Sequence, residues 1–478
     1  MPKVTFFRRF RWLLLALGIL LLAIFLLLQP WGVSSLHSNP KPAKTYLEAV
    51  QRIQKMDAVD SAAMNPLCRI TFLTQGQKTE RAIVLVHGYT SCPYQFFELG
   101  KQFYDIGYNV LIAPMPYHGL ADRMTDAHAQ LTAEDLAAYA DEVVDIAQGL
   151  GEKVTMMGLS VGGVVTAWAA QNRSDIELAV LVSPAFGYGV VPPNLTAAAM
   201  NTYLLLPNGY DWWNPAKQEQ GGVPHGYPRY SKHALAQALR LGFSVQQSAK
   251  KQKPPTPLLL ITNANDHQIN NERTAEIAAL WRKNGAKLEV HEFSETLQLK
   301  HDLIEPLNQK EKTEEIVYPH LLEWTLKAQG DSLQKIYKLV AKTEQSDINY
   351  AAIQNMDDPE SPYFTNKEAA FRPVKGQFTV YQFKAVYPGY SFRGDGYYLF
   401  HDVLTLKTDK NNQILEAYQY TLEWTESVAS DLYRSTAKNV MWSNNNLDIH
   451  LLKLTKSDPA EDGGKKILEE EGILQLNK

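Results

Sequence analysis

Residues 154–163 read VTMMGLSVGG. An apolar run of the strand type ends in the pattern Gly-x-Ser-x-Gly, and a helix rich in small apolar residues follows. A serine at such a sharp turn stands at the carboxyl end of its strand, beside the amino end of the next helix. The turn leaves no room for bulk around Ser160, and Gly158 and Gly162 supply that space. Gly163 lets the helix approach the sheet closely.

This context predicts that Ser160 is a nucleophile on a nucleophile elbow. The amino end of the following helix offers unpaired N–H groups and a positive dipole, which suit a developing oxyanion. The bare Gly-x-Ser-x-Gly pattern also fits a glycine-rich strand–helix turn with a capping serine. The interpretation as a nucleophile therefore depends on partners elsewhere in the chain.

Composition limits the class of protein. A chain of 478 residues is too long for one ordinary domain, so two or three units are expected. It is 45% hydrophobic and 21% charged, as in ordinary globular proteins, and its net charge of −4 predicts no nucleic-acid partner. No Cys/His spacing of the metal-binding type is present, so no metal site is expected.

The amino-terminal segment is much more apolar than the rest of the chain. An uninterrupted, leucine-rich apolar run covers 12–28, which at about 17 residues is the lower limit for a membrane span. Basic residues within 1–11 precede it, and such charges place the amino terminus in the cytoplasm. We therefore expect a membrane anchor at 12–28 with the rest of the chain on the periplasmic or extracellular side. A cleaved signal peptide is the alternative, although no clear Ala-x-Ala site follows.

The two cysteines are Cys68 and Cys92. An exported domain would permit a disulfide between them, because disulfides persist in oxidising compartments. Two unpaired buried thiols are the other interpretation. Upstream of Cys68, residues 29–64 are expected to form a linker and a short helix.

Apolar runs of the strand type recur at wide intervals, and helical patterns fill the gaps. Most runs are continuous rather than alternating, which is typical of parallel strands buried on both faces. Strand–helix alternation of this kind predicts a doubly wound, mostly parallel α/β sheet. The runs lie at 82–86, 109–113, 154–157, 178–182, 258–262 and 287–293.

A second loop is expected beside Ser160. The residues His-Gly-Tyr-Thr at 87–90 directly follow a buried strand, so they lie at the carboxyl end of the sheet. Gly88 allows the backbone to turn inward. The N–H groups of Tyr89 and Val161 would then hold an oxyanion together. A simple His-Gly turn is the alternative.

The partners of a nucleophilic serine should follow in the order acid, then histidine. Asp266 comes off the end of the strand at 258–262, and His301 lies in the loop after the next strand. His301 would take the proton from Ser160 and later return it to the leaving group. His291 lies inside a strand, where a structural role is expected. Asp302 is the rival acid, but an adjacent residue rarely faces its neighbour's ring.

The segment 184–257 is too long for a simple crossover and is rich in tyrosine and tryptophan. We expect it to form a cap over Ser160. Its aromatic residues would line an apolar acyl pocket. The alternative is that they form the core of the cap itself.

Taken together, residues 65–330 resemble the α/β-hydrolases. The resemblance rests on the loop at 87–90, on Gly158 to Gly162, on Asp266 and on His301. The branch resembled is that of monoacylglycerol lipases, lysophospholipases and carboxylesterases, which grade into serine aminopeptidase-like sequences. It implies a Ser–His–Asp triad that hydrolyses carboxylic esters without a cofactor, and a helical cap at the position of 184–257.

The pattern of apolar residues changes after the hydrolase-like part. Alternating runs within 346–457 predict a β-rich domain of unknown role, and 458–478 is expected to be a mobile tail. The sequence thus predicts a membrane-anchored serine hydrolase acting on small acyl esters such as monoacylglycerols or lysophospholipids. An aminopeptidase-like serine peptidase and a non-catalytic envelope-binding scaffold are the alternatives. The oligomeric state cannot be predicted.

Overall fold

The computed structural model describes residues 3–34, 36–58, 63–330, 335–344, 378–390, 397–410, 414–423, 429–435, 441–443, 446–448, 452–456, 466–470 and 472–475. By its internal contacts the chain divides into two units, Met1–Thr313 and Glu314–Lys478. The candidate site lies entirely within the first unit.

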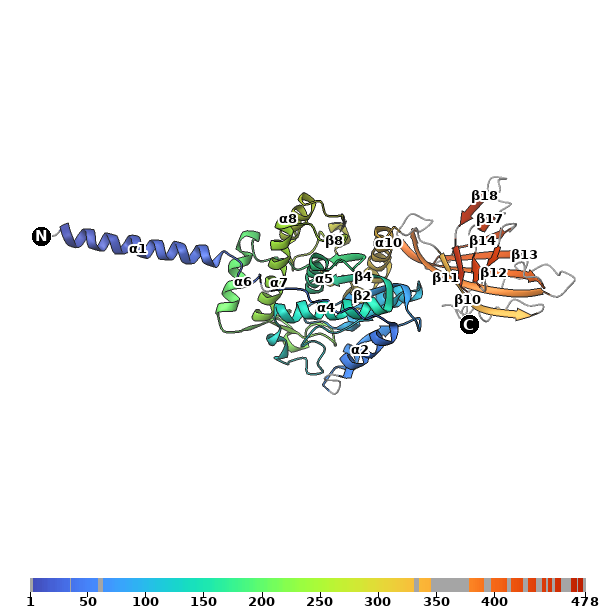
Figure 1. The fold of residues 1–478 in the computed structure, drawn as a ribbon, viewed down its shortest axis with the longest axis horizontal. Coiled ribbons are helices and arrows are strands. Elements are labelled where there is room, and N and C mark those ends of the chain that lie inside the picture. The colour runs from blue at the N-terminus through green and yellow to red at the C-terminus, as the bar shows by residue number, and fades with distance from the viewer. Residues whose placement is uncertain are drawn as a thin grey trace. The chain divides into compact units, whose positions relative to one another are not determined.

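A central sheet organises the first unit (Figure 1). Within the described residues it has seven strands in the order β1-β3-β2-β4-β5-β8-β9. All neighbours pair in parallel except the edge strand β1, which is antiparallel to β3. The prediction of a mostly parallel α/β sheet of the α/β-hydrolase type is confirmed. The strands are β1 (Thr71–Leu73), β2 (Thr79–Val86), β3 (Asn109–Ile112), β4 (Gly151–Leu159), β5 (Leu178–Val182), β8 (Leu258–Asn263) and β9 (Leu288–Phe293).

Helices follow the strands and cover the sheet with apolar faces. The helix α4 (Ala133–Leu150) begins at a capping box between Thr132 and Asp135, and it packs against β2 and β4. The helix α5 (Val161–Asn172) is almost wholly buried between β4, β5 and α7 (Lys232–Lys251), because its residues are small and apolar. The remaining helices of the first unit, beyond α1, are α2 (Tyr46–Ala58), α3 (Phe97–Asp105), α6 (Thr196–Leu205), α8 (Asn271–Lys283) and α9 (Pro306–Lys312).

The cap occupies the chain between β5 and β8. It contains α6, the short antiparallel pair β6 (Tyr210–Trp212) and β7 (Arg229–Ser231), and the long helix α7. Buried residues of α6 and α7 pack with Val33 into a small apolar cluster of their own. Part of the cap is thus its own core, which was one of the two expectations for this segment.

The amino-terminal helix α1 (Lys3–Leu27) covers most of the predicted membrane anchor. Its apolar side chains from Trp12 to Leu26 are largely exposed, and the buried Asn201 of α6 donates hydrogen bonds to the carbonyls of Leu27 and Gln29, at 2.8 and 2.7 Å. In the part of the chain that the structure describes, none of the helices has the length and apolarity needed to cross a membrane. The membrane anchor expected at 12–28 stays a prediction.

The second unit begins before α10 (Tyr318–Ala328), which the sequence assigned to the hydrolase part. Its described strands form one ten-stranded sheet with the order β15-β16-β19-β10-β11-β12-β13-β14-β17-β18. Two short strands lie in the segment expected to be a mobile tail: β18 pairs with β17, and β19 pairs in parallel with β10. The mobility of this segment stays a prediction. The strands are β10 (Lys335–Glu344), β11 (Phe378–Tyr390), β12 (Tyr397–Asp409), β13 (Ile414–Glu423), β14 (Ala429–Ser435), β15 (Met441–Ser443), β16 (Asn446–Asp448), β17 (Leu452–Lys456), β18 (Lys466–Glu470) and β19 (Gly472–Gln475).

Candidate active site

Ser160 stands on a strained turn between β4 and α5. Its φ of 59° and ψ of −116° lie in a region that residues with a side chain rarely adopt. A Cβ added at Gly158 would collide with the carbonyl of Gly162, and one added at Gly162 would collide with the carbonyl of Val86. The two glycines are therefore required by the packing of the turn itself.

Three side chains from separate loops meet at this turn. The Oγ of Ser160 lies 2.9 Å from Nε2 of His301, and Nδ1 of His301 lies 2.6 Å from Oδ2 of Asp266. All three residues are buried. With the ring neutral and protonated at Nδ1, His301 donates to Asp266 and accepts from the serine hydroxyl.

The carboxylate of Asp266 is held in place by the turn that follows β8. Its Oδ1 accepts hydrogen bonds from the backbone N–H groups of Gln268 and Ile269, at 2.9 and 3.3 Å. The other oxygen, Oδ2, is thereby directed to His301. The rival Asp302 makes no hydrogen bond to that ring, and His291 lies in β9 with its Nε2 2.7 Å from Glu289.

The pKa of His301 is raised above the ordinary value of 6.5. Burial lowers it, but the hydrogen bond and the negative charge of Asp266 outweigh that effect, and Asp302 adds to the increase. The ring is thus a stronger base than an ordinary histidine. A stronger base suits a residue that must accept the proton of a hydroxyl group.

The loop at 87–90 lies against Ser160, as its position in the sequence predicts. A Cβ built at Gly88 would be 3.7 Å from the Cβ of Ser160, and the Gly88 N–H donates to Oε1 of Gln95 at 2.8 Å. No hydrogen bond from the backbone N–H of Tyr89 or Val161 is present among the described residues. Both groups remain available to an oxyanion.

Buried histidines support this loop from behind. Nε2 of His87 accepts the N–H of Met115 at 3.0 Å, and its Nδ1 lies 2.8 Å from the Gly88 carbonyl. Burial and the neighbouring His118 lower the pKa of His87, so its ring is neutral. Burial, chiefly, also lowers the pKa of His128 to about 3, and Nδ1 of His128 lies 2.7 Å from the hydroxyl of Tyr89.

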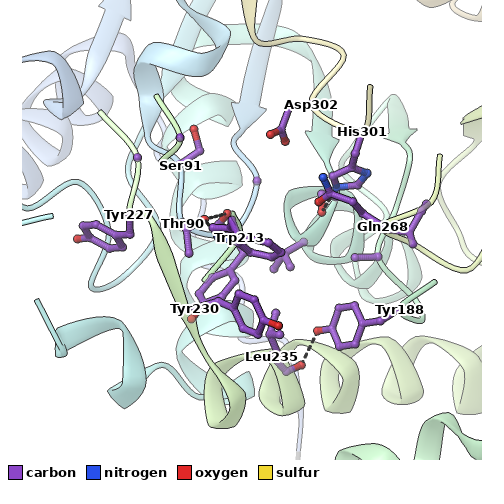
Figure 2. A pocket seen from close by; sticks show the side chains of 18 of the residues that line it. Thr90, Ser91, Tyr188, Trp213, Tyr227, Tyr230, Leu235, Gln268, His301 and Asp302 are labelled. Carbon is purple, nitrogen blue, oxygen red and sulfur yellow. Dashed lines mark hydrogen bonds between the residues drawn. The ribbon is translucent and has the colours of Figure 1, made fainter. Parts of the chain in front are cut away.

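Ser160 and His301 line a cavity of about 390 Å³, which Figure 2 shows from close by. In that view Ser91 and Asp302 lie at one end, and Tyr188, Tyr230 and Leu235 lie at the opposite end. The cavity is therefore polar at one end and aromatic and aliphatic at the other. The aromatic and aliphatic residues that line the cavity include Tyr188, Val190, Val191, Tyr203, Trp213, Tyr230 and Leu235.

The polar end carries two carboxylates that the sequence did not single out as cavity residues. Asp302 is half-buried, and burial raises its pKa although the neighbouring His301 opposes this. Glu305 is fully buried, and its Oε2 lies 3.0 Å from Nε2 of His225. In the described part of the chain, no lysine or arginine lines this cavity. His267 also lines the cavity.

Cys68 and Cys92 form a disulfide with their Cα atoms 5.2 Å apart. Cys92 follows the loop at 87–90 by two residues, and both cysteines are fully buried. The disulfide joins the segment before β1 to the residues that directly follow the loop at 87–90. Among the described residues, no group of three or more acidic, histidine or cysteine side chains could hold a metal ion.

Comparison with known proteins gives a family match and a similar curated protein. Residues 77–304 match the family described as serine aminopeptidase S33. A thermostable monoacylglycerol lipase from Bacillus sp. (strain H-257) is 24% identical over 193 residues, which cover 39% of this chain and 71% of that protein.

Two solved structures are also similar to this chain. The monoacylglycerol lipase of Paleococcus ferrophilus has a TM-score of 0.41 and 20% identity, covering 54% of this chain and 98% of that one. A soluble variant of monoglyceride lipase from Saccharomyces cerevisiae has a TM-score of 0.42 and 13% identity, covering 54% of this chain and 91% of that one.

Proposed function

We propose that this chain hydrolyses carboxylic esters with Ser160 as nucleophile. Its match to the serine aminopeptidase S33 family and its similarity to a monoacylglycerol lipase support this proposal. In this proposal His301 is the general base and then the general acid, and Asp266 fixes the tautomer of its ring. The supporting observation is the chain of contacts at 2.9 Å from Ser160 to His301 and at 2.6 Å from His301 to Asp266.

The reaction has two halves. His301 takes the proton of the Ser160 hydroxyl as its oxygen attacks the ester carbonyl, and the N–H groups of Tyr89 and Val161 bind the oxyanion. The tetrahedral intermediate collapses to an acyl-enzyme, and His301 gives the proton to the departing alcohol. Water then attacks the acyl-enzyme with His301 again as base, and the carboxylic acid leaves.

The cavity supports an apolar acyl group and an uncharged alcohol. The apolar end, with Tyr188, Tyr230 and Leu235, suits an alkyl chain. The polar end carries Asp302 and no cationic side chain in the described residues, so a phosphate on the alcohol would meet negative charge. We therefore favour monoacylglycerol-like esters over lysophospholipids.

The second candidate is a peptidase with the same triad. One observation favours it: the Asp302 carboxylate lines the cavity beside His301, where it would bind an ammonium group on a substrate. Aminoacyl p-nitroanilides and fatty-acid p-nitrophenyl esters distinguish the two. Faster turnover of the anilides, measured as kcat/KM, would replace the esterase proposal with the peptidase.

The disulfide supports a proposal about location. Because disulfides such as Cys68–Cys92 persist in oxidising compartments, we propose that the part of the chain with this disulfide and the candidate site lies outside the reducing cytoplasm. Alkylation of thiols in intact cells, followed by mass spectrometry, tests this. Oxidised cysteines support the proposal, and alkylated Cys68 and Cys92 contradict it.

The esterase proposal is tested with p-nitrophenyl esters of increasing chain length. Ser160→Ala is the inactive variant, and Ser248→Ala, on α7, is the matched control that keeps the site intact. We expect turnover by the wild type and the control and none above background by Ser160→Ala. A folded wild-type protein without turnover on the esters and on monoacylglycerols would reject the proposal.

A further inference from the structure

Thr90, the residue after the oxyanion residue Tyr89, has an unusual backbone. Its φ is 66°, in the left-handed region, which β-branched residues such as threonine rarely adopt. The residue is 7% exposed. Such a conformation persists only where surrounding contacts hold it.

The contacts that hold Thr90 come from the cap. Nε1 of Trp213 donates to Oγ1 of Thr90 at 2.8 Å, and the N–H of Tyr227 donates to the Thr90 carbonyl at 2.7 Å. The Thr90 hydroxyl in turn donates to the carbonyl of Tyr89 at 2.6 Å. A continuous path of hydrogen bonds therefore runs from the indole of Trp213 to the backbone of Tyr89.

The cap also holds the side chain of Tyr89. Its hydroxyl accepts the N–H of Ser231 at 3.1 Å, and Ser231 ends the cap strand β7. On the same hydroxyl, Nδ1 of His128 lies 2.7 Å away. Tyr89 is thus fixed by the cap both through its side chain and through the residue that follows it.

We propose that Trp213 is a positioning residue for the oxyanion hole: through Thr90 it sets the direction of the Tyr89 N–H. An oxyanion donor must lie within a few tenths of an ångström of its working position, since losing one such donor costs about 10²- to 10³-fold in kcat. Trp213 does not touch the reacting atoms in this account. The proposal rests on the proposed esterase function and makes the cap part of the catalytic machinery rather than a passive cover.

The position of Trp213 makes this coupling sensitive to substrate. Trp213 is 41% exposed and lines the cavity, and the centroid of its ring lies 4.4 Å from that of Tyr230. An acyl chain in the apolar end would contact the same indole that holds Thr90. The binding energy of the acyl chain would then stabilise the transition state. A longer acyl chain would therefore raise kcat rather than only lower KM.

Trp213→Phe removes the indole N–H and keeps an aromatic ring in the cavity. The matched control is Trp31→Phe, which removes an indole hydrogen bond to the carbonyl of Leu26, far from the cavity in the sequence and outside its lining. We expect Trp213→Phe to lower kcat on a p-nitrophenyl ester by about 10-fold or more, with KM changed by less than about 3-fold. Trp31→Phe should match the wild type.

Thr90 supplies two further variants. Thr90→Val removes the hydroxyl, and its effect should not add to that of Trp213→Phe, because both interrupt one path. Thr90→Gly removes the side chain that disfavours the left-handed region, so in the Trp213→Phe background it should restore part of kcat. A residue with only a structural role in the cap would not show this rescue.

The outcomes separate this proposal from the esterase proposal. If the wild type and Trp31→Phe are both inactive, the esterase proposal itself is rejected. Active wild type and control, with Trp213→Phe changing KM but not kcat, or with additive effects and no rescue by Thr90→Gly, would overturn the positioning role alone. Near-ultraviolet circular dichroism of each variant identifies any loss of folding, and the rescue variant then decides the outcome.

Discussion

Nδ1 of His301 lies 2.6 Å from Oδ2 of Asp266, and both side chains are buried. Burial opposes a charge on the ring, while the carboxylate favours it, and the net result is a pKa of His301 above its ordinary 6.5. The contact with Asp266 therefore sets the tautomer of the His301 ring and makes the ring a stronger base.

The first prediction concerns the pH dependence of activity. The reaction needs neutral His301, so kcat/KM should rise with pH and reach half its maximum above pH 6.5. Asp266→Asn removes the charge and leaves burial as the main influence, so the midpoint should move to lower pH. The rate should fall by about 10⁴-fold. A midpoint that does not move would contradict the role of Asp266, and Asp302→Asn is the comparison for the rival acid.

The second prediction concerns the turn that carries Ser160. Gly158→Ala should prevent folding or greatly reduce stability, because its Cβ would meet the backbone of Gly162. Gly209→Ala is the control, since its Cβ would meet only the side chain of Lys232 at 3.5 Å, an ordinary contact. Soluble yield and thermal unfolding report the difference. Equal stability of the two variants would show that the turn is looser than described.

The third prediction concerns the disulfide. Cys68 and Cys92 are separated by 24 residues, so the bond should stabilise the first unit by about 3 kcal/mol through the unfolded chain. Urea unfolding of the wild type with and without a reductant, and of a Cys68→Ser/Cys92→Ser double variant, measures this. The double variant should unfold at lower urea and be insensitive to the reductant. Wild-type unfolding unaffected by reductant would argue that the bond contributes nothing.

The fourth prediction concerns charge on the alcohol. With Asp302 at the polar end and no lysine or arginine lining the described cavity, a monoacylglycerol should be hydrolysed faster than a lysophosphatidic acid with the same acyl chain. Asp302→Asn should raise kcat/KM for the phosphate ester, and the ratio between the two kcat/KM values should therefore become smaller. If the wild type prefers the phosphate, the electrostatic argument about the cavity is wrong.

The sequence predicts the parts of the site that depend on local patterns. The strand–glycine–serine–helix run around Ser160, and the loops after successive buried strands that carry Asp266 and His301, are readable because parallel strands end at one edge of a sheet. These patterns also predict the sheet.

The rest of the site depends on contacts between distant segments. Trp213 and Tyr227 reach Thr90 from the cap, and His225 pairs with Glu305 across 80 positions of sequence. No periodicity or motif marks such pairs, because aromatic residues in a cap serve equally well as its core. The left-handed φ of Thr90 could not be predicted either, because threonine normally avoids this region.

The central claim is that Ser160 is a nucleophile activated by His301. The most direct measurement is intact-protein mass spectrometry after reaction with a fluorophosphonate, followed by peptide mapping, on the wild type, Ser160→Ala and Ser248→Ala. The account predicts one phosphonyl adduct on Ser160 in the wild type and in Ser248→Ala, and none in Ser160→Ala. A folded wild-type protein without an adduct, or with an adduct on another serine, would contradict it.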